Sequence, residues 1–188
     1  MKIILASQSP RRRELLKLMG LEFEIRVADI DETMDPNGDP MTEVARVSAA
    51  KAMAVDGKDD VVIAADTIVV CEGKILGKPH SEQEARDMLT LLSGRDHQVM
   101  TGFTVRQGFQ TVTRTEVSHI YFRPLDPGEI GAYVKTGEPM DKAGAYGIQG
   151  KAALFVTRLE GDYYNVMGLP VCALTECLRS FGVKILGV

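Results

Sequence analysis

Cysteine is scarce in this chain and follows no ligand pattern. The 188 residues include three, Cys71, Cys172 and Cys177, with no CxxC spacing and no neighbouring histidine. An odd number in this arrangement argues against both a disulfide framework and a zinc site. We therefore expect the chain to work in a reducing compartment, the cytoplasm.

Long apolar runs and an excess of positive charge are also missing. The stretch from Lys2 to Ala6 is too short, and too soon followed by arginines, to be a signal peptide, and no 18-residue apolar run occurs. We expect no membrane partner. Lys and Arg number 22 against 26 Asp and Glu, a net charge of −4. Stable binding to nucleic acid is therefore not expected, and an anionic ligand must be held by a local basic cluster.

Several common catalytic motifs do not occur. The GxxxxGK[ST] element of P-loop enzymes is absent, and the histidines His80, His97 and His119 are scattered, with no Ser-His-acid set in a nucleophile-elbow setting. No repeat or linker divides the chain, of which 45% is hydrophobic. We predict one folding unit spanning residues 1–188.

What the sequence does contain is an alternation of strand and helix patterns. The strands are predicted at about 3–6, 22–27, 61–70, 74–76, 99–106, 111–122 and 153–159. The helices are predicted at about 10–19, 41–55, 81–92, 126–136 and 170–181. This order predicts an α/β fold with a mixed sheet flanked by helices, and long loops that form the walls of a site.

Three arginines open the first predicted helix. Arg11, Arg12 and Arg13 occupy the end where the macrodipole and the free N–H groups favour negative charge. A phosphate bound there by N–H groups, the Ser9 hydroxyl and one or two guanidinium groups would balance the arginines. The alternative is that these side chains extend into water.

Asp66 is the single carboxylate of the strand at 61–70, which is apolar except for Thr67. Burying an unpaired carboxylate is costly, so Asp66 requires a metal ion, a cationic side chain or a hydrogen-bonded niche. We favour a functional role for Asp66 over a purely structural pairing with an arginine or lysine.

Glu32 lies in the acidic segment 29–32, a pattern that is by itself typical of a solvated loop. Together with Asp66 it indicates a hard cation bound by oxygen, Mg²⁺ or Mn²⁺, because no histidine is well placed for zinc. Lys51 and Lys78, each of which alone would be taken for a surface lysine, are candidates for contacting a polyphosphate.

Residues 137–150 form a glycine-rich segment with charged, aromatic and amide side chains between the glycines. Glycine permits close approach of a ligand to the backbone. Tyr146 is a candidate wall for a base, and the Gln149 amide can pair with a base edge that offers one donor and one acceptor. The alternative is a flexible surface loop.

Five sequence blocks follow one another along nearly the whole chain. They are LASQSPRR at 5–12, ADTIV at 65–69, GKP at 77–79, the segment 137–150 and NVMGLP at 165–170. Together they make the chain resemble the Maf nucleotide pyrophosphatases, a family first associated with inhibition of septum formation in bacteria. The resemblance implies a Maf/inosine-triphosphatase-like fold, a mixed twisted sheet flanked by helices with two lobes around a deep cleft, in a homodimer.

The resemblance also implies roles for individual residues. Asp66 matches the catalytic acidic residue, the proton acceptor. The residues implied in catalysis are Asp66, Glu32, Lys51 and Lys78, with Asp66 and Glu32 also holding the metal. The residues implied in substrate binding are Ser9, Arg11, Arg12, Thr67 and Gln149.

The late block AYGIQG at 145–150 resembles the branch of the family that prefers dTTP and UTP. The implied activity is metal-dependent hydrolysis of these nucleoside triphosphates to the monophosphate and pyrophosphate. Two alternatives stay open: a pyrophosphatase for non-canonical purine nucleotides, and a nucleotide-binding regulator of septum formation with little catalysis.

Overall fold

The computed structural model describes residues 1–187 and divides into two compact units. Unit 1 comprises Met1–Asp66, Thr101–Glu116 and Gly168–Val188, and unit 2 comprises Thr67–Met100 and Val117–Met167. The prediction of one folding unit over residues 1–188, and that of a deep cleft, stay predictions.

The strands form one seven-stranded mixed sheet in the order β2-β1-β3-β5-β6-β7, with β4 paired to β3. The strands are β1 Ile3–Leu5, β2 Glu24–Ile25, β3 Val61–Cys71, β4 Lys74–Leu76, β5 Asp96–Gln107, β6 Gln110–Phe122 and β7 Val156–Glu160. β1 pairs in parallel with β2 and β3, whereas β4 and β7 pair antiparallel to β3 and β6. The predicted mixed α/β class is confirmed.

Most of the helices begin directly after a capping residue. They are α1 Pro10–Leu18, α2 Pro40–Ala54, α3 Glu82–Leu92, α4 Pro127–Val134, α5 Tyr163–Met167 and α6 Val171–Ser180. The side chains of Ser9, Asp39, Ser81 and Asp126 accept backbone N–H bonds at the starts of α1 to α4. Within residues 1–187, no helix has the length and apolar character needed to span a membrane.

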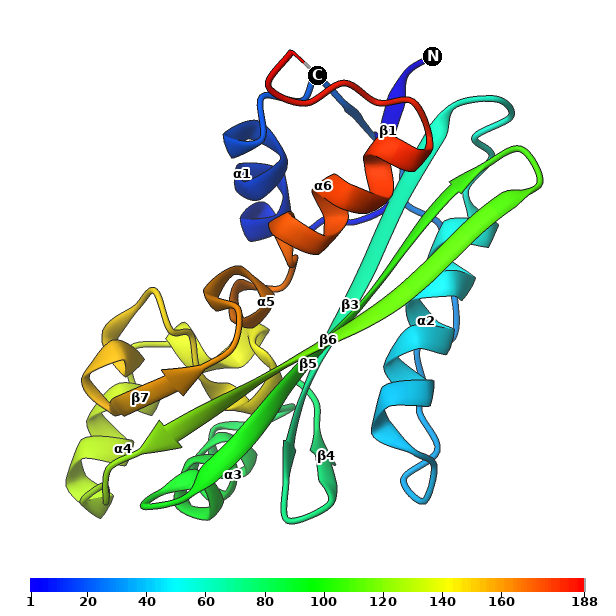
Figure 1. Cartoon of the computed structure of the whole chain (residues 1–188). Helices are drawn as coiled ribbons and strands as arrows, with labels where there is room; N and C mark the ends of the chain where they lie inside the picture. Colours follow the sequence, from blue (N-terminus) through cyan, green and yellow to red (C-terminus); the bar gives the residue numbers. More distant parts are fainter. Residues whose placement is uncertain (188) are drawn as a thin grey trace. The chain divides into compact units, whose positions relative to one another are not determined.

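Unit 1 packs helices on both faces of its part of the sheet. Figure 1 shows α2 on one side of these strands and α1 and α6 on the other. The buried strand β1 pairs with the first part of β3, where Val61 to Ala65 are fully buried. α2 comes very close to β5, since a Cβ added at Gly102 would lie 2.6 Å from the Val44 carbonyl oxygen.

Unit 2 has an apolar core of its own. α3 packs against α4 and against two short 3-10 helices, η1 Glu138–Asp141 and η2 Ala143–Ala145. Leu89 and Leu92 of α3 and Ile120 of β6 are fully buried in this core. Val69 and Cys71 of β3 and Val99 of β5 are also buried in this core.

Two sequence predictions in unit 2 are corrected, and one helix was missed. The segment 137–150 is not a plain loop, because it contains η1 and η2. The strand predicted from residue 153 starts at Val156, since η3, Lys151–Leu154, closes a turn with Phe155 N bonded to Ala152 O at 3.0 Å. The short helix α5 was not predicted, because five residues are too few to show helical periodicity.

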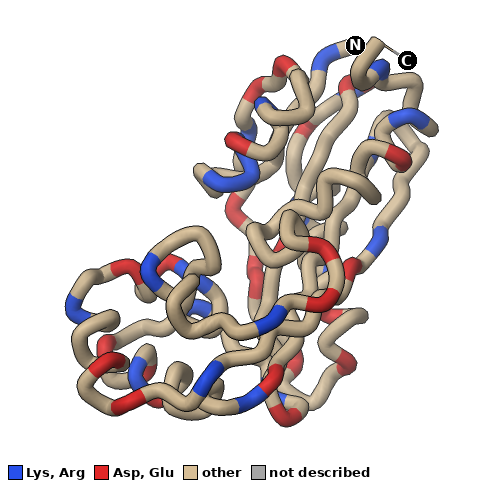
Figure 2. The backbone as a smooth tube through the Cα atoms, turned by 60° about the vertical axis from the view of Figure 1, so that its left-hand side comes forward, with Lys and Arg blue, Asp and Glu red and all other residues tan. Residues whose placement is uncertain are grey.

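Basic and acidic residues are interspersed along the described backbone of both units (Figure 2). This distribution agrees with the net charge of −4. Any strong local field must therefore come from particular side chains that lie close together.

Replacing Gly102 by alanine should destabilise the protein by about 1–3 kcal/mol, because the new methyl group would overlap the α2 backbone. Gly77→Ala is the matched control, since a Cβ there meets nothing within 4 Å. Urea unfolding of both variants measures the effect, and equal midpoints would contradict the close approach of α2 to β5.

Candidate active site

The centre of the candidate site is a lysine between two carboxylates. In unit 1, Lys51 Nζ lies 2.7 Å from Asp66 Oδ1 and 2.9 Å from Glu32 Oε2. The Lys51 and Asp66 side chains are only 14% and 15% exposed, whereas that of Glu32 is 55% exposed. Two of these three charges are thus largely shielded from water, which strengthens their mutual attraction.

Asp66 and Lys51 each lie next to buried apolar residues of their own element, β3 and α2. Asp66 follows the fully buried run Val61 to Ala65 on β3. Lys51 lies in the last turn of α2, next to the fully buried Ala52. The positive charge expected next to the buried Asp66 carboxylate is therefore supplied by Lys51. A structural pairing of Asp66 with a lysine was the alternative to a catalytic role, and the catalytic role of Asp66 stays a prediction.

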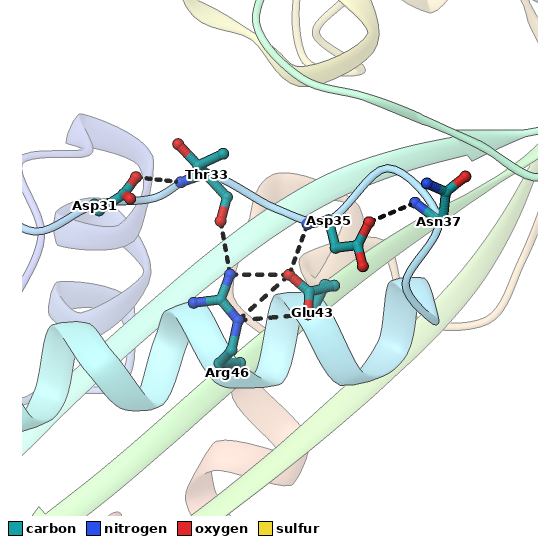
Figure 3. Close-up of polar contacts among 6 residues, drawn as sticks. All are labelled: Asp31, Thr33, Asp35, Asn37, Glu43 and Arg46. Carbon is teal, nitrogen blue, oxygen red and sulfur yellow. Dashed lines mark hydrogen bonds and ion pairs between the residues drawn. The ribbon is translucent and has the colours of Figure 1, made fainter.

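The acidic loop that carries Glu32 is tied to α2 by a second charged pair (Figure 3). Arg46 donates from Nη2 to the Thr33 carbonyl oxygen at 2.7 Å and to Glu43 Oε2 at 2.9 Å. Glu43 Oε2 also accepts from the Asp35 backbone N–H at 3.1 Å. Backbone groups on the C-terminal side of Glu32 are thus fixed to the same helix that carries Lys51.

The start of α1 places Ser9 and Arg12 together. Arg12 is buried, and its Nε donates to the Gly168 carbonyl oxygen at 2.8 Å, while its Nη1 donates to Ser7 Oγ at 3.2 Å. Burial lowers the pKa of Arg12, and the nearby charges of Asp66 and Glu32 partly oppose this shift. The alternative that Arg12 extends into water is therefore wrong. Arg11 is half-buried in the same turn.

Unit 1 thus holds six of the predicted site residues, which are Ser9, Arg11, Arg12, Glu32, Lys51 and Asp66. Direct ion pairs join Lys51 to Asp66 and to Glu32. The backbone N–H of Arg12 donates a hydrogen bond of 3.5 Å to the Ser9 side-chain oxygen Oγ. Within the described chain, no three His, Cys, Asp or Glu residues form a group that could hold a metal ion by themselves.

The other three predicted residues, Thr67, Lys78 and Gln149, belong to unit 2. Thr67 is half-buried on β3, and Lys78 and Gln149 are exposed. A hydrogen bond of 3.0 Å from Gly144 N to the Gly77 carbonyl oxygen joins the segments of Lys78 and Gln149. Gly144 has a φ of 66° and its Cα faces Val69 so closely that a Cβ would lie 2.8 Å from Val69 Cγ2. Glycine is therefore required at this contact.

The glycine-rich segment is braced from inside unit 2. Tyr133 OH donates to Glu138 Oε1 at 2.9 Å, and Glu138 Oε2 accepts from Lys151 N at 3.2 Å. A Cβ at Gly150 would lie 2.0 Å from Glu138 Oε1, so the carboxylate occupies the space that this glycine leaves. The alternative of a flexible loop does not describe a segment with these internal bonds.

Tyr146 does not form the wall of an open site. It is 5% exposed, its hydroxyl lies 2.7 Å from His97 Nε2, and its ring meets Phe122 edge to face at 4.8 Å. The interpretation of Tyr146 as a base-stacking residue is therefore wrong. The physical reason is that an aromatic ring in a tight glycine-rich turn packs on its own core, with its hydroxyl satisfied by a buried partner.

Sequence reasoning missed the supporting residues Arg46, Glu43, Glu138, Tyr133 and His97. Of these, Glu43 and Arg46 offered a signal, because their i, i+3 spacing on a predicted helix allows an ion pair. The partners of the others are distant or in irregular backbone, so no periodic pattern reveals them.

The buried His97 should make stability depend on pH. Burial lowers the pKa of His97 from 6.5 to about 4. Between pH 6.5 and about pH 4, the unfolded chain binds a proton at this histidine and the folded chain does not. The stability from this group is therefore present above pH 6.5 and is lost as pH falls towards 4, by about 2–3 kcal/mol.

Urea unfolding of His97→Gln should thus show a smaller loss of stability between neutral and acid pH than the wild type. His80→Gln, at an exposed position, should lose as much as the wild type. An identical pH dependence in all three proteins would contradict the neutral, buried state of His97.

Comparison with known proteins identifies close relatives over the full length. A family model described as Maf-like protein matches residues 2–181. A protein of Moorella thermoacetica named dTTP/UTP pyrophosphatase is 51% identical over 191 residues, which cover 99% of this chain and 98% of the relative. A Bacillus cereus protein of the same name is 48% identical over 186 residues, which cover 98% and 97%.

The fold has a relative among solved structures. The Ham1 protein of Staphylococcus aureus matches with a TM-score of 0.51 and 16% identity, over 97% of this chain and 100% of that protein. At this identity the likeness concerns the fold alone. The family model and the curated relatives carry the assignment that the sequence blocks predicted: the chain belongs to the Maf-like protein family.

Proposed function

We propose that this protein is a metal-dependent pyrophosphatase that hydrolyses dTTP and UTP to the nucleoside monophosphate and pyrophosphate. The names and high coverage of the curated relatives support the reaction and the substrates. The single observation that carries the proposal is the shielded cluster in which Lys51 Nζ lies 2.7 Å from Asp66 and 2.9 Å from Glu32. Such a cluster offers both a carboxylate base and a cation for phosphate.

The carboxylates fit Mg²⁺ or Mn²⁺. Asp66 Oδ1 and Glu32 Oε2 converge on one point, because both lie within 3 Å of the same nitrogen atom. Mg²⁺ is usually held by one or two carboxylates together with substrate phosphates and water. We therefore propose Asp66 and Glu32 as the metal-holding residues. When bound, the cation supplies Lewis-acid stabilisation of the charge on phosphate oxygens.

The side chains of the cluster then have distinct tasks. Asp66 accepts the proton of the water that attacks the α-phosphorus, and pyrophosphate leaves. Lys51 offsets negative charge on the phosphate oxygens, where a preorganised cation is most effective. Arg11, Arg12 and the Ser9 hydroxyl, at the start of α1, hold the triphosphate, in the setting in which helix N-termini bind phosphate.

Three further residues proposed to act on the substrate belong to unit 2. Lys78 is an exposed lysine that offers a further charge to the triphosphate, and Thr67 and Gln149 act in substrate choice. The hydrogen bond between Gly144 and Gly77 supports this assignment, because it fixes the segments of Lys78 and Gln149 together. The braced backbone around Glu138 would keep the Gln149 amide in a defined place.

The wider setting follows the same proposal. We propose that the chain folds as a single unit, forms a homodimer and works in the cytoplasm, where its nucleotide substrates occur. Its three cysteines are free thiols, which is compatible with a reducing compartment. A link to septum formation would be a consequence of nucleotide hydrolysis.

Asp66→Asn should lower kcat for dTTP by roughly 10²–10⁴-fold, because the amide cannot accept the proton of the attacking water. Asp59→Asn, an exposed carboxylate beyond α2, is the matched control and should keep full activity. The assay measures pyrophosphate release from dTTP, UTP, CTP, ITP, GTP and 7-methyl-GTP, with Mg²⁺ and with EDTA.

Metal-dependent release confined to dTTP and UTP is the expected pattern for the wild type. Release mainly from ITP would favour the purine alternative, and no release from any nucleotide would favour a binding protein. Near-normal turnover of the Asp66 variant would remove this residue from the mechanism.

Gln149→Ala should relax the preference for dTTP and UTP by about tenfold, since one hydrogen-bonding group that reads the base is lost. Gln110→Ala, at an exposed position of β6, should leave the preference unchanged. The ratio of kcat/KM values across the same nucleotides measures the effect. An unaltered ratio in the Gln149 variant would place base recognition elsewhere.

A further inference from the structure

Lys51 has a geometric relation to the metal-holding carboxylates that the proposed reaction alone does not require. Its ammonium group contacts both of them, at 2.7 Å from Asp66 Oδ1 and 2.9 Å from Glu32 Oε2. These are direct, charge-assisted contacts. The ammonium group therefore uses an oxygen from each of the two carboxylates proposed to hold the metal.

The scaffold positions Asp66 and the backbone beside Glu32. Asp66 lies on β3, and its side chain is 15% exposed. Glu32 lies one residue before Thr33, whose carbonyl oxygen accepts from Arg46 at 2.7 Å (Figure 3). The carboxylates of Asp66 and Glu32 thus offer one position for a cation, either the Lys51 ammonium group or a metal ion.

One position cannot hold two cations at these distances. A divalent metal binds carboxylate oxygen at about 2.0–2.6 Å, so it would lie close to the point that Lys51 Nζ now occupies. Two positive charges that close repel each other, and the repulsion is strengthened by the low exposure of the Lys51 and Asp66 side chains, 14% and 15%. The lysine must therefore move before the same two oxygens bind a metal ion.

We propose that Lys51 and the divalent metal compete for Asp66 and Glu32, and that the nucleotide resolves the competition by providing phosphate oxygens as a new partner for the ammonium group. This inference rests on the proposed function and deepens it. In the nucleotide-free protein, the Lys51 ammonium group then pairs with the carboxylates in place of the metal ion. Metal and nucleotide bind with positive coupling, because each favours the arrangement that the other needs.

The competition predicts that the affinity for the metal ion rises when Lys51 is removed. Removing a residue of the catalytic machinery should tighten metal binding: Lys51→Met should bind Mn²⁺ at least about tenfold more tightly than the wild type in the absence of nucleotide, since a competing charge has been removed. Lys51→Arg keeps the charge and should bind Mn²⁺ as weakly as the wild type.

The experiment is a titration of the free, full-length protein with Mn²⁺, followed by electron paramagnetic resonance of the unbound ion. Lys17→Met is the matched control, because it removes one positive charge from the exposed surface of α1 and should not change the affinity. Circular dichroism checks that each variant is folded. Mn²⁺ affinity of the Lys51→Met protein equal to or below that of the wild type would overturn the proposal, as would an equal gain in Lys17→Met.

A second measurement needs no variant. The NMR signal of the Lys51 ammonium group should change little when Mg²⁺ alone is added at moderate concentration, and should shift when Mg²⁺ is added with a non-hydrolysable dTTP analogue. A shift of the same size with moderate Mg²⁺ alone would contradict the role proposed for the nucleotide, and no shift even with Mg²⁺ and the analogue together would contradict the competition. Because neither readout involves turnover, loss of the competition is distinguishable from loss of pyrophosphatase activity.

Discussion

The ion pair between Lys51 and Asp66 is the interaction on which the rest of the site depends. β3 is buried along most of its length, so its carboxylate needs a cation in direct contact. Removing one partner of such a largely buried pair costs about 3–5 kcal/mol. The Asp66 carboxylate is thereby accommodated within a largely apolar strand, with its charge stabilised by the lysine.

Helix α2 provides this cation and also organises its surroundings. Lys51 contacts Asp66 and Glu32, while Arg46 and Glu43 of the same helix fix the backbone of the acidic loop. The position of α2 depends in turn on Gly102 of β5, where a side chain would meet the helix backbone. A packing contact in the core of unit 1 therefore sets the spacing of the charges, which links stability to chemistry.

The sequence predicted most of the elements, because their signals are local. Capping residues such as Ser81 and the apolar run of β3 located them within a few residues. Asp66 and the arginines at the start of α1 were visible as violations of local rules, whereas Glu32, Lys51 and Lys78 had no such signal of their own. The lysine that compensates Asp66 is 15 residues away, and the inward turn of Tyr146 depends on His97, 49 residues away. Tertiary contacts of this kind carry no periodic pattern, so the buried role of Tyr146 and the contacts of His97 and Glu138 were not predictable from the sequence.

In the proposed reaction, water attacks the α-phosphorus of a pyrimidine triphosphate and expels pyrophosphate. Hydrolysis of dTTP with Mg²⁺ in ¹⁸O-labelled water, followed by mass spectrometry of the products, tests this step most directly. We expect dTMP that carries one ¹⁸O atom, together with unlabelled pyrophosphate. Formation of dTDP and orthophosphate, or label in the pyrophosphate, would contradict it.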